Sequence, residues 1–209
     1  IIEIVYKTLE VIEGAGKSTQ IKLLQSSLKQ EGHSVEILRE PGTTQLGEKI
    51  RDVFLEKTNE KVDPMTEAFL LYASRKHLDQ NFLQEHLKNK SIVIADRYSD
   101  ATVAYQCFGK GLSEDFVQYI HEKSDLLSPD LTFYMDITAE ASKARIDDRE
   151  LDRMESESLD FFNKVRSGYL EIAKSNPDRI IVLDAELSVE DLQDKIFNEV
   201  KNRLNASLG

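Results

Sequence analysis

Several features that define other protein classes are scarce or missing in this sequence. Cys107 is the only cysteine, so no disulfide can form within the chain, which fits a reducing, cytoplasmic location. No apolar run exceeds a handful of residues, and we therefore expect neither a membrane-spanning segment nor a membrane partner. The four prolines are not clustered, and no linker, repeat or low-complexity tract is visible.

Positive charge and metal-ligand spacing are also lacking. The chain has 27 lysines and arginines against 38 aspartates and glutamates, a formal net charge of −11, which argues against nucleic acid as a partner. The four histidines show no spacing typical of a metal site. An anionic ligand would therefore have to be held by a local cluster of arginines and backbone dipoles. At 209 residues the chain is long enough for one sizeable core, and we expect a single α/β domain over residues 1–209.

The most informative stretch lies near the N-terminus. An apolar segment typical of a buried strand, residues 1–9, leads into a glycine-rich loop and then into a segment with apolar residues at helical spacing. This order is the context of a phosphate-binding loop, in which backbone N–H groups and a helix N-terminus surround a polyphosphate. We predict that Lys17 reaches the β- and γ-phosphates of ATP and that the Ser18 hydroxyl ligates Mg²⁺. The predicted ATP-binding residues are Glu13, Gly14, Ala15, Gly16, Lys17, Ser18 and Thr19.

One position departs from the full phosphate-loop pattern GxxxxGK[ST]. Val11 stands where the first glycine is expected. A β-branched residue resists positive φ, so either the turn is reshaped or nucleotide affinity is reduced. The alternative interpretation, a strand-to-helix turn with a solvated Lys17, is disfavoured by the flanking strand and helix.

The rest of the chain alternates between predicted strands and predicted helices. Strands are expected at residues 34–38, 91–95, 130–136 and 179–183, and helices at about 45–56, 63–87, 113–123, 159–172 and 189–200. This alternation predicts a mostly parallel, doubly wound sheet. Because loops at the carboxyl ends of such strands face the ligand crevice, we expect Arg39, Glu40, Asp96 and Arg97 to lie there.

A highly charged segment, residues 139–155, carries Arg145, Arg149 and Arg153 at four-residue steps. In a continuous helix they would share a face. Spacing alone favours a solvated, salt-bridged helix. The phosphate loop in an acidic chain favours the alternative, a lid whose arginines close over the transferred group.

Six motifs, in order along almost the whole chain, resemble those of the thymidylate kinases, which are P-loop nucleoside monophosphate kinases. They are Glu13–Thr19, Arg39–Gly42, Leu71–Arg75, Asp96–Tyr98, Ala104–Gln106 and Leu151–Glu155. The resemblance implies a P-loop NTPase fold with a five-stranded parallel sheet flanked by helices and a lid at about residues 139–155. It also implies Mg²⁺-dependent transfer of the ATP γ-phosphoryl group to dTMP, giving dTDP and ADP in nucleotide biosynthesis, and a homodimer.

The resemblance assigns catalytic roles to Lys17, Arg97, Arg149 and Arg153. Arg97 matches the arginine that bridges donor and acceptor phosphates, and Asp96 joins Ser18 as a metal-site residue. Some members carry a catalytic arginine in the phosphate loop and others carry it in the lid. This loop contains no arginine, so the lid arginines are the prediction.

The resemblance also implies an acceptor site for the nucleoside monophosphate. Tyr105 matches the ring beneath the deoxyribose, where its bulk would exclude a 2′-hydroxyl, and Thr102 and Gln106 match polar positions near the pyrimidine. The residues predicted for this site are Glu13, Arg39, Pro41, Arg51, Leu71, Arg75, Arg97, Thr102, Tyr105 and Gln106. Judged by their positions alone, helical arginines such as Arg51 and Arg75 are more often surface residues than ligand contacts.

Two alternatives to a dTMP kinase remain open. Leu71 stands where many members have an aromatic ring, and Ala101 stands where a small hydroxyl residue is usual, so dUMP or UMP could be the acceptor. Val11 leaves open a nucleotide-binding module with weakened catalysis. Deoxynucleoside kinases usually have Glu-Arg-Ser where this chain has Asp96-Arg97-Tyr98, which counts against them.

Overall fold

The computed structural model describes residues 6–12, 14–145 and 151–206. Its centre is a five-stranded parallel sheet in the order β2-β3-β1-β4-β5. The strands are β1 (Tyr6–Glu10), β2 (Val35–Arg39), β3 (Ile92–Asp96), β4 (Leu131–Asp136) and β5 (Ile180–Asp184). β1 is buried along its whole length, as expected for a central strand covered on both faces. The predicted doubly wound parallel sheet is confirmed.

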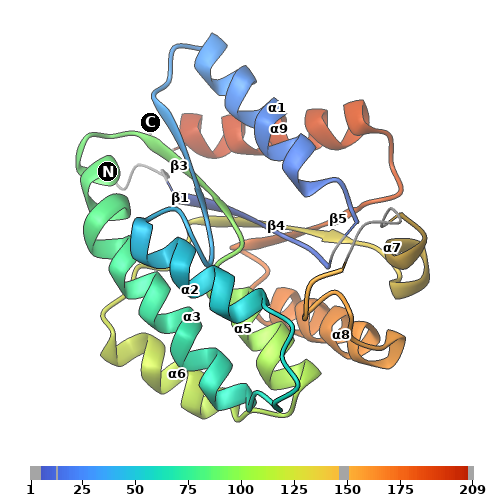
Figure 1. Cartoon of the computed structure of the whole chain (residues 1–209). Coiled ribbons are helices and arrows are strands. Elements are labelled where there is room, and N and C mark those ends of the chain that lie inside the picture. The colour runs from blue at the N-terminus through green and yellow to red at the C-terminus, as the bar shows by residue number, and fades with distance from the viewer. Residues whose placement is uncertain (1–5, 13, 146–150, 207–209) are drawn as a thin grey trace.

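Helices cover both faces of the sheet (Figure 1). α1 and α9 lie on one side, and α2, α3, α5, α6 and α8 lie on the other. The helices are α1 (Lys17–Gln30), α2 (Gln45–Leu55), α3 (Pro64–Leu78), α4 (Gln84–Lys88), α5 (Ser99–Thr102), α6 (Glu114–Lys123), α7 (Ala139–Arg145), α8 (Leu159–Ser175) and α9 (Val189–Ala206). Two π-helical segments, η1 (Asp79–Leu83) and η2 (Val103–Gly109), continue α3 and α5. Among the described residues, none of the helices is both long and apolar enough to span a bilayer.

α8 packs closely against η2, the segment that carries Tyr105. A Cβ added at Gly168 would lie 2.7 Å from the Phe108 ring, so only glycine allows the two segments to approach this closely. Tyr105 lies on η2 at this contact, with its ring centroid 6.0 Å from that of Phe161 on α8.

The structure does not place Arg145 and Arg153 on one continuous helix, which was the condition for a shared arginine face. Arg145 lies on α7, whereas Arg153 lies in a turn. The reason is local, because the Asp152 carboxylate accepts the backbone amides of Met154 and Glu155, each at 2.8 Å, and so holds a turn instead of a helix. Arg149 lies outside the described residues.

Candidate active site

The loop between β1 and α1 forms a hollow suited to an anion. Gly14 and Gly16 adopt positive φ values of 79° and 80°, which only glycine adopts readily. The N-cap of α1 is Gly16, which has no side chain to cap the helix, so the N-terminus of α1 and its positive dipole face the hollow. The hollow is lined by Val11, Gly14, Ala15, Gly16, Lys17, Ser18 and Thr19. Glu13, predicted for this site, lies outside the described residues.

Val11 does not disturb the bend of this loop. It is not among the residues with positive φ, so the sharp turns fall on Gly14 and Gly16. Its side chain is buried in the main apolar core, with 1% exposed. A β-branched residue is therefore accommodated at the position where the pattern has glycine.

Lys17 and Asp96 connect the loop to β3. Their side chains form an ion pair, with 10% of Lys17 and 19% of Asp96 exposed. Asp96 is brought there by the parallel register, in which it pairs with Leu9 near the end of β1. The predicted lysine and the predicted metal-site carboxylate thus lie side by side at the carboxyl edge of the sheet.

Arg97 lies in a strained turn immediately after β3. It is a non-glycine residue with a φ of 70°, and its amide donates to the Leu9 carbonyl at 3.2 Å. The following amide, that of Tyr98, donates to Glu10 Oε1 at 2.7 Å. The Arg97 guanidinium lies over the Tyr105 ring, 4.9 Å from its centroid.

Glu10 is a buried carboxylate beside the Arg97 turn to which the sequence analysis gave no role. It is fully buried at the end of β1, and the Tyr169 hydroxyl donates to its Oε2 at 2.9 Å. Burial, helped by the nearby Asp100 carboxylate, raises the pKa of Glu10 to about 8, although Arg97 and Lys17 act in the opposite direction. Its signal in the sequence was a carboxylate at the carboxyl end of the first strand, directly before the glycine-rich loop.

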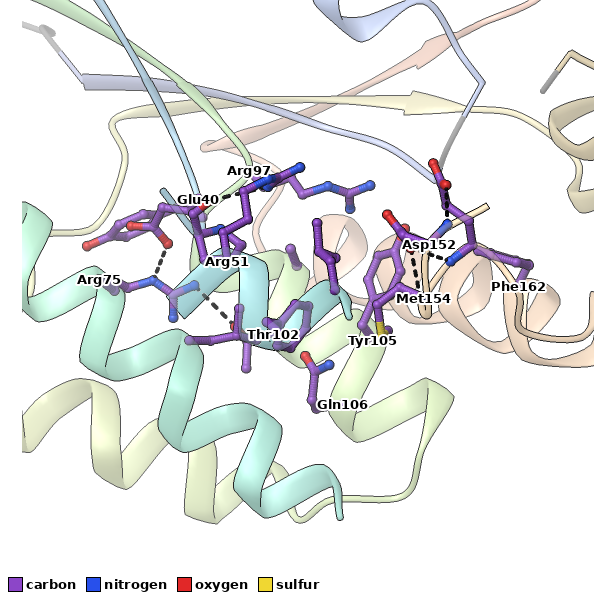
Figure 2. A pocket seen from close by; sticks show the side chains of 17 residues that line it. Glu40, Arg51, Arg75, Arg97, Thr102, Tyr105, Gln106, Asp152, Met154 and Phe162 are labelled. Carbon is purple, nitrogen blue, oxygen red and sulfur yellow. Dashed lines mark hydrogen bonds and ion pairs between the residues drawn. The ribbon is translucent and has the colours of Figure 1, made fainter. Parts of the chain in front are cut away.

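A second cavity adjoins the Arg97 turn and contains about 630 Å³ of space outside protein atoms, including open solvent at its mouth. Figure 2 shows how its side chains converge from the loop after β2, from α2, α3, α5 and η2, and from the Asp152–Met154 turn. Its lining includes eight of the predicted acceptor residues: Pro41, Arg51, Leu71, Arg75, Arg97, Thr102, Tyr105 and Gln106. We call this cavity the cleft.

Arg75 is a buried residue of the cleft, not a surface arginine. Its Nε donates to Glu40 Oε2 at 2.6 Å, and its Nη2 donates to Thr102 Oγ1 at 3.2 Å. Its guanidinium also lies over the Tyr72 and Tyr98 rings. Burial acts to lower the pKa of Arg75, but the Glu40 carboxylate outweighs it and holds that pKa above its usual range. Its Nη1 is buried and has no hydrogen-bond partner in the described part of the chain.

The mouth of the cleft concentrates positive charge. Arg51 Nη1 donates to the Pro41 carbonyl at 3.2 Å. Burial, together with the guanidinium groups of Arg39 and Arg97, lowers the pKa of Arg51. Arg39 itself does not line the cleft, because it is half-exposed and paired with Glu48 at 2.8 Å. Guanidinium groups gathered in this way favour an anion between them.

Arg153 is placed beside the cleft but is directed away from it. Its Nε and Nη2 donate to the Phe54 carbonyl at 3.0 and 2.7 Å, and its Nη1 contacts Glu67. The residues on either side of it, Asp152 and Met154, line the cleft, whereas Arg153 does not. The segment after residue 150 is therefore attached to the C-terminus of α2 and to α3.

Glu67, which also contacts Arg153, is a second residue that the sequence analysis missed. It is fully buried on α3, and Gln106 Nε2 donates to its Oε2 at 3.0 Å. It lies four residues before Leu71 and eight before Arg75, so all three share one helix face. That spacing could have identified it.

Comparisons with known proteins all match thymidylate kinases, and each match covers most of the chain. A family model described as thymidylate kinase matches residues 9–196. Thymidylate kinases of Chlorobaculum tepidum and Prosthecochloris aestuarii are 43% and 40% identical to the chain, over 92% and 96% of its length and 95% of their own. The crystal structure of thymidylate kinase from Ehrlichia chaffeensis is similar with a TM-score of 0.72 at 30% identity, covering 86% of this chain and 91% of that one.

Proposed function

The chain belongs to the thymidylate kinase family and is a phosphotransferase acting on dTMP, and we propose that the loop hollow and the cleft bind the two substrates of this reaction. The alternative acceptors dUMP and UMP are not favoured by the names of its relatives. The observation that carries the proposal is the Asp96–Arg97 pair, in which Asp96 contacts Lys17 of the loop and Arg97 lines the cleft.

The family implies ATP as the donor, and the loop hollow fits its phosphates. The uncapped amides of α1 and the Lys17 ammonium would bind the β- and γ-phosphates. Lys17 would exchange its Asp96 partner for phosphate oxygens. Glu13, Gly14, Ala15, Gly16, Ser18 and Thr19 complete the proposed ATP site.

The donor set beside the loop also fits Mg²⁺. The Ser18 hydroxyl and the Asp96 carboxylate are hard oxygen donors, and a magnesium site takes few protein ligands because water and phosphate supply the rest. Among the described residues, no group of three or more His, Cys, Asp or Glu could form a cage for another ion. When bound, Mg²⁺ would neutralise charge on the donor phosphates.

We call the end of the cleft lined by Leu71, Arg75, Thr102 and Gln106 the base end, and its polar groups are proposed to complement thymine. The unpaired Arg75 Nη1 is a donor suited to the O4 keto group, and the unpaired Gln106 Oε1 is an acceptor suited to the N3–H group. Thr102 and Leu71 line the same region, and the Tyr105 ring is proposed to pack beneath the deoxyribose. Satisfying two buried polar atoms favours a ligand that carries both groups.

The transfer step needs alignment and positive charge, because the acceptor is already a phosphate oxygen and requires no general base. Arg39, Arg51 and Arg97 are proposed to hold the dTMP phosphate, and Arg97 to bridge it to the donor. Arg149 and Arg153 are proposed to neutralise charge on the transferring group. For Arg153 this requires the exchange of its contacts with Phe54 and Glu67. Enclosure by the lid would exclude water as a competing acceptor.

Coupled ADP release, measured with dTMP, dUMP, UMP and thymidine as acceptors, tests this proposal. We expect the highest kcat/KM with dTMP. Equal or better turnover with UMP would contradict the dTMP assignment. ATP binding without ADP release, measured by calorimetry alongside the assay, would indicate a nucleotide-binding module instead.

Further properties extend the proposal. A homodimer is supported by exposed apolar side chains on neighbouring helices, with Val53 on α2, Phe69 on α3 and Tyr119 on α6 each more than half exposed. A cytoplasmic location is supported by Cys107, which is a free, buried thiol. Nucleotides are the proposed ligands, and nucleic acid and membranes are not expected as partners.

A further inference from the structure

Glu67 lies behind the base end of the cleft with none of its side chain exposed. Its Oε2 accepts a hydrogen bond from Gln106 Nε2 at 3.0 Å. Its Oε1 contacts two cations, Lys110 Nζ at 2.8 Å and the Arg153 guanidinium. A carboxylate is buried this completely only where donors and cations surround it, so the paired, ionised form fits the site.

An ionised carboxylate has acceptors only, so the end of the Gln106 amide that faces Glu67 must be its NH₂ group. The reversed amide would place its carbonyl oxygen against the carboxylate with no hydrogen between them. The carbonyl Oε1 is therefore the end left over, and it is buried without a partner in a residue that lines the cleft. Figure 2 shows the Gln106 amide directed into the group of lining side chains.

We propose that Glu67 is a specificity-determining positioning residue, which fixes the Gln106 amide so that the cleft selects a pyrimidine with an N–H group at ring position 3. This inference rests on the proposed function, in which the base of dTMP enters this end of the cleft. Thymine and uracil carry N3–H. Cytosine carries a lone pair at N3, which would face the Gln106 oxygen, and an amino group at C4, which would face the Arg75 donor.

The test compares dUMP with dCMP, which both lack the 5-methyl group and differ at the N3 and C4 edge. Using the full chain, kcat/KM for dUMP is expected to exceed that for dCMP by at least about 10². In Glu67→Gln the new side chain can accept or donate, so the Gln106 amide can turn over. The ratio is expected to fall at least about tenfold in this variant, mainly because dCMP improves, while the ratio of dTMP to dUMP is unchanged. A proportional loss for dUMP and dCMP would overturn the proposal.

A matched control is available on the continuation of the same helix. Asp79 is also buried and accepts from an amide, Gln84 Nε2 at 3.1 Å, but it does not line the cleft. Asp79→Asn is expected to leave the ratio of dUMP to dCMP as in the wild type, and an equal fall in this control would overturn the proposal.

If Glu67→Gln does not fold, Gln106→Met provides a second test of the proposal. It lacks the amide and is expected to lose the preference for dUMP, whereas a retained preference would overturn the proposal. Wild-type protein that prefers dTMP but uses dUMP and dCMP equally would overturn the role of Glu67 and leave the proposed function standing. Absence of turnover with dTMP would overturn the proposed function itself.

Discussion

The Glu10 carboxylate accepts a hydrogen bond from the Tyr98 amide at 2.7 Å, and this bond ties the end of β1 to the turn that presents Arg97 to the cleft. The Arg97 amide is itself bound to the Leu9 carbonyl. The backbone is therefore held on both sides of a residue whose left-handed conformation costs about 1–2 kcal/mol. β1 supplies the contacts that offset this cost.

Removing the Glu10 side chain is expected to release that turn. In Glu10→Ala, kcat should fall at least about tenfold, because a small displacement of a positioned group is costly in phosphoryl transfer. Glu10→Gln keeps an acceptor for the Tyr98 amide and should retain most of the activity. Steady-state kinetics in a double-mutant cycle with Arg97→Ala would measure this, and Glu10→Ala should add little in that background. Independent, multiplying losses would contradict a role through Arg97.

Glu10 also predicts a dependence of stability on pH. Burial raises its pKa to about 8 in the folded chain, against about 4.3 for an unperturbed glutamate. The folded state therefore binds the proton more tightly, and the contribution to stability is present below about pH 4 and lost as pH rises through about 8. Glu10→Gln has no proton to lose, so its melting temperature relative to the wild type should rise between pH 5 and 9. A constant difference across that range would exclude this titration.

Lys17→Ala is expected to leave the fold intact and to lower the rate by at least about 10², because the donor phosphates lose their cation. Coupled ADP release gives the rate, and circular dichroism checks the fold. Lys22→Ala provides the control, since Lys22 is exposed on the same helix. A near-normal rate for Lys17→Ala would contradict the assignment of the loop.

Arg153→Ala is expected to lower kcat at least about tenfold with little change in KM for ATP, as proposed for a group that acts on transition-state charge. The melting temperature should also fall, because the contacts with the Phe54 carbonyl and Glu67 are lost. Arg153→Lys should restore little, since lysine lacks the planar fork. A lower melting temperature with unchanged kcat would mean that Arg153 stabilises the fold and does not act in catalysis.

Phe69→Glu is expected to convert a dimer into monomers, because a charge in an apolar interface is left unpaired. Sedimentation or light scattering at several protein concentrations measures this. Val189→Glu is the control, since Val189 is a comparably exposed apolar residue at the start of α9, far in sequence from the proposed interface. A monomeric wild type would refute the proposed dimer.

The four strands after β1 were predicted to within a residue at each end, because buried parallel strands appear in the sequence as short continuous apolar runs. The loop hollow followed from the strand, glycine loop and helix pattern, whereas most of the cleft residues were assigned by the resemblance to thymidylate kinases. Glu10 and Glu67 could not be recognised in that way. Their partners, Tyr98 and Gln106, lie 88 and 39 residues away along the chain, and only tertiary packing brings them together. The four-residue spacing of the arginines in the charged segment did not predict the local backbone, because the Asp152 carboxylate holds a turn around Arg153.

Asp96 contacts Lys17 of the loop hollow and Arg97 lines the cleft, so a single peptide unit sets the distance between the residues proposed to bind the two nucleotides. The groups proposed to contact the base lie elsewhere, on α3 and η2. Evolution or engineering could therefore retune the choice of base through those two segments while the spacing of the reacting phosphates stays as it is.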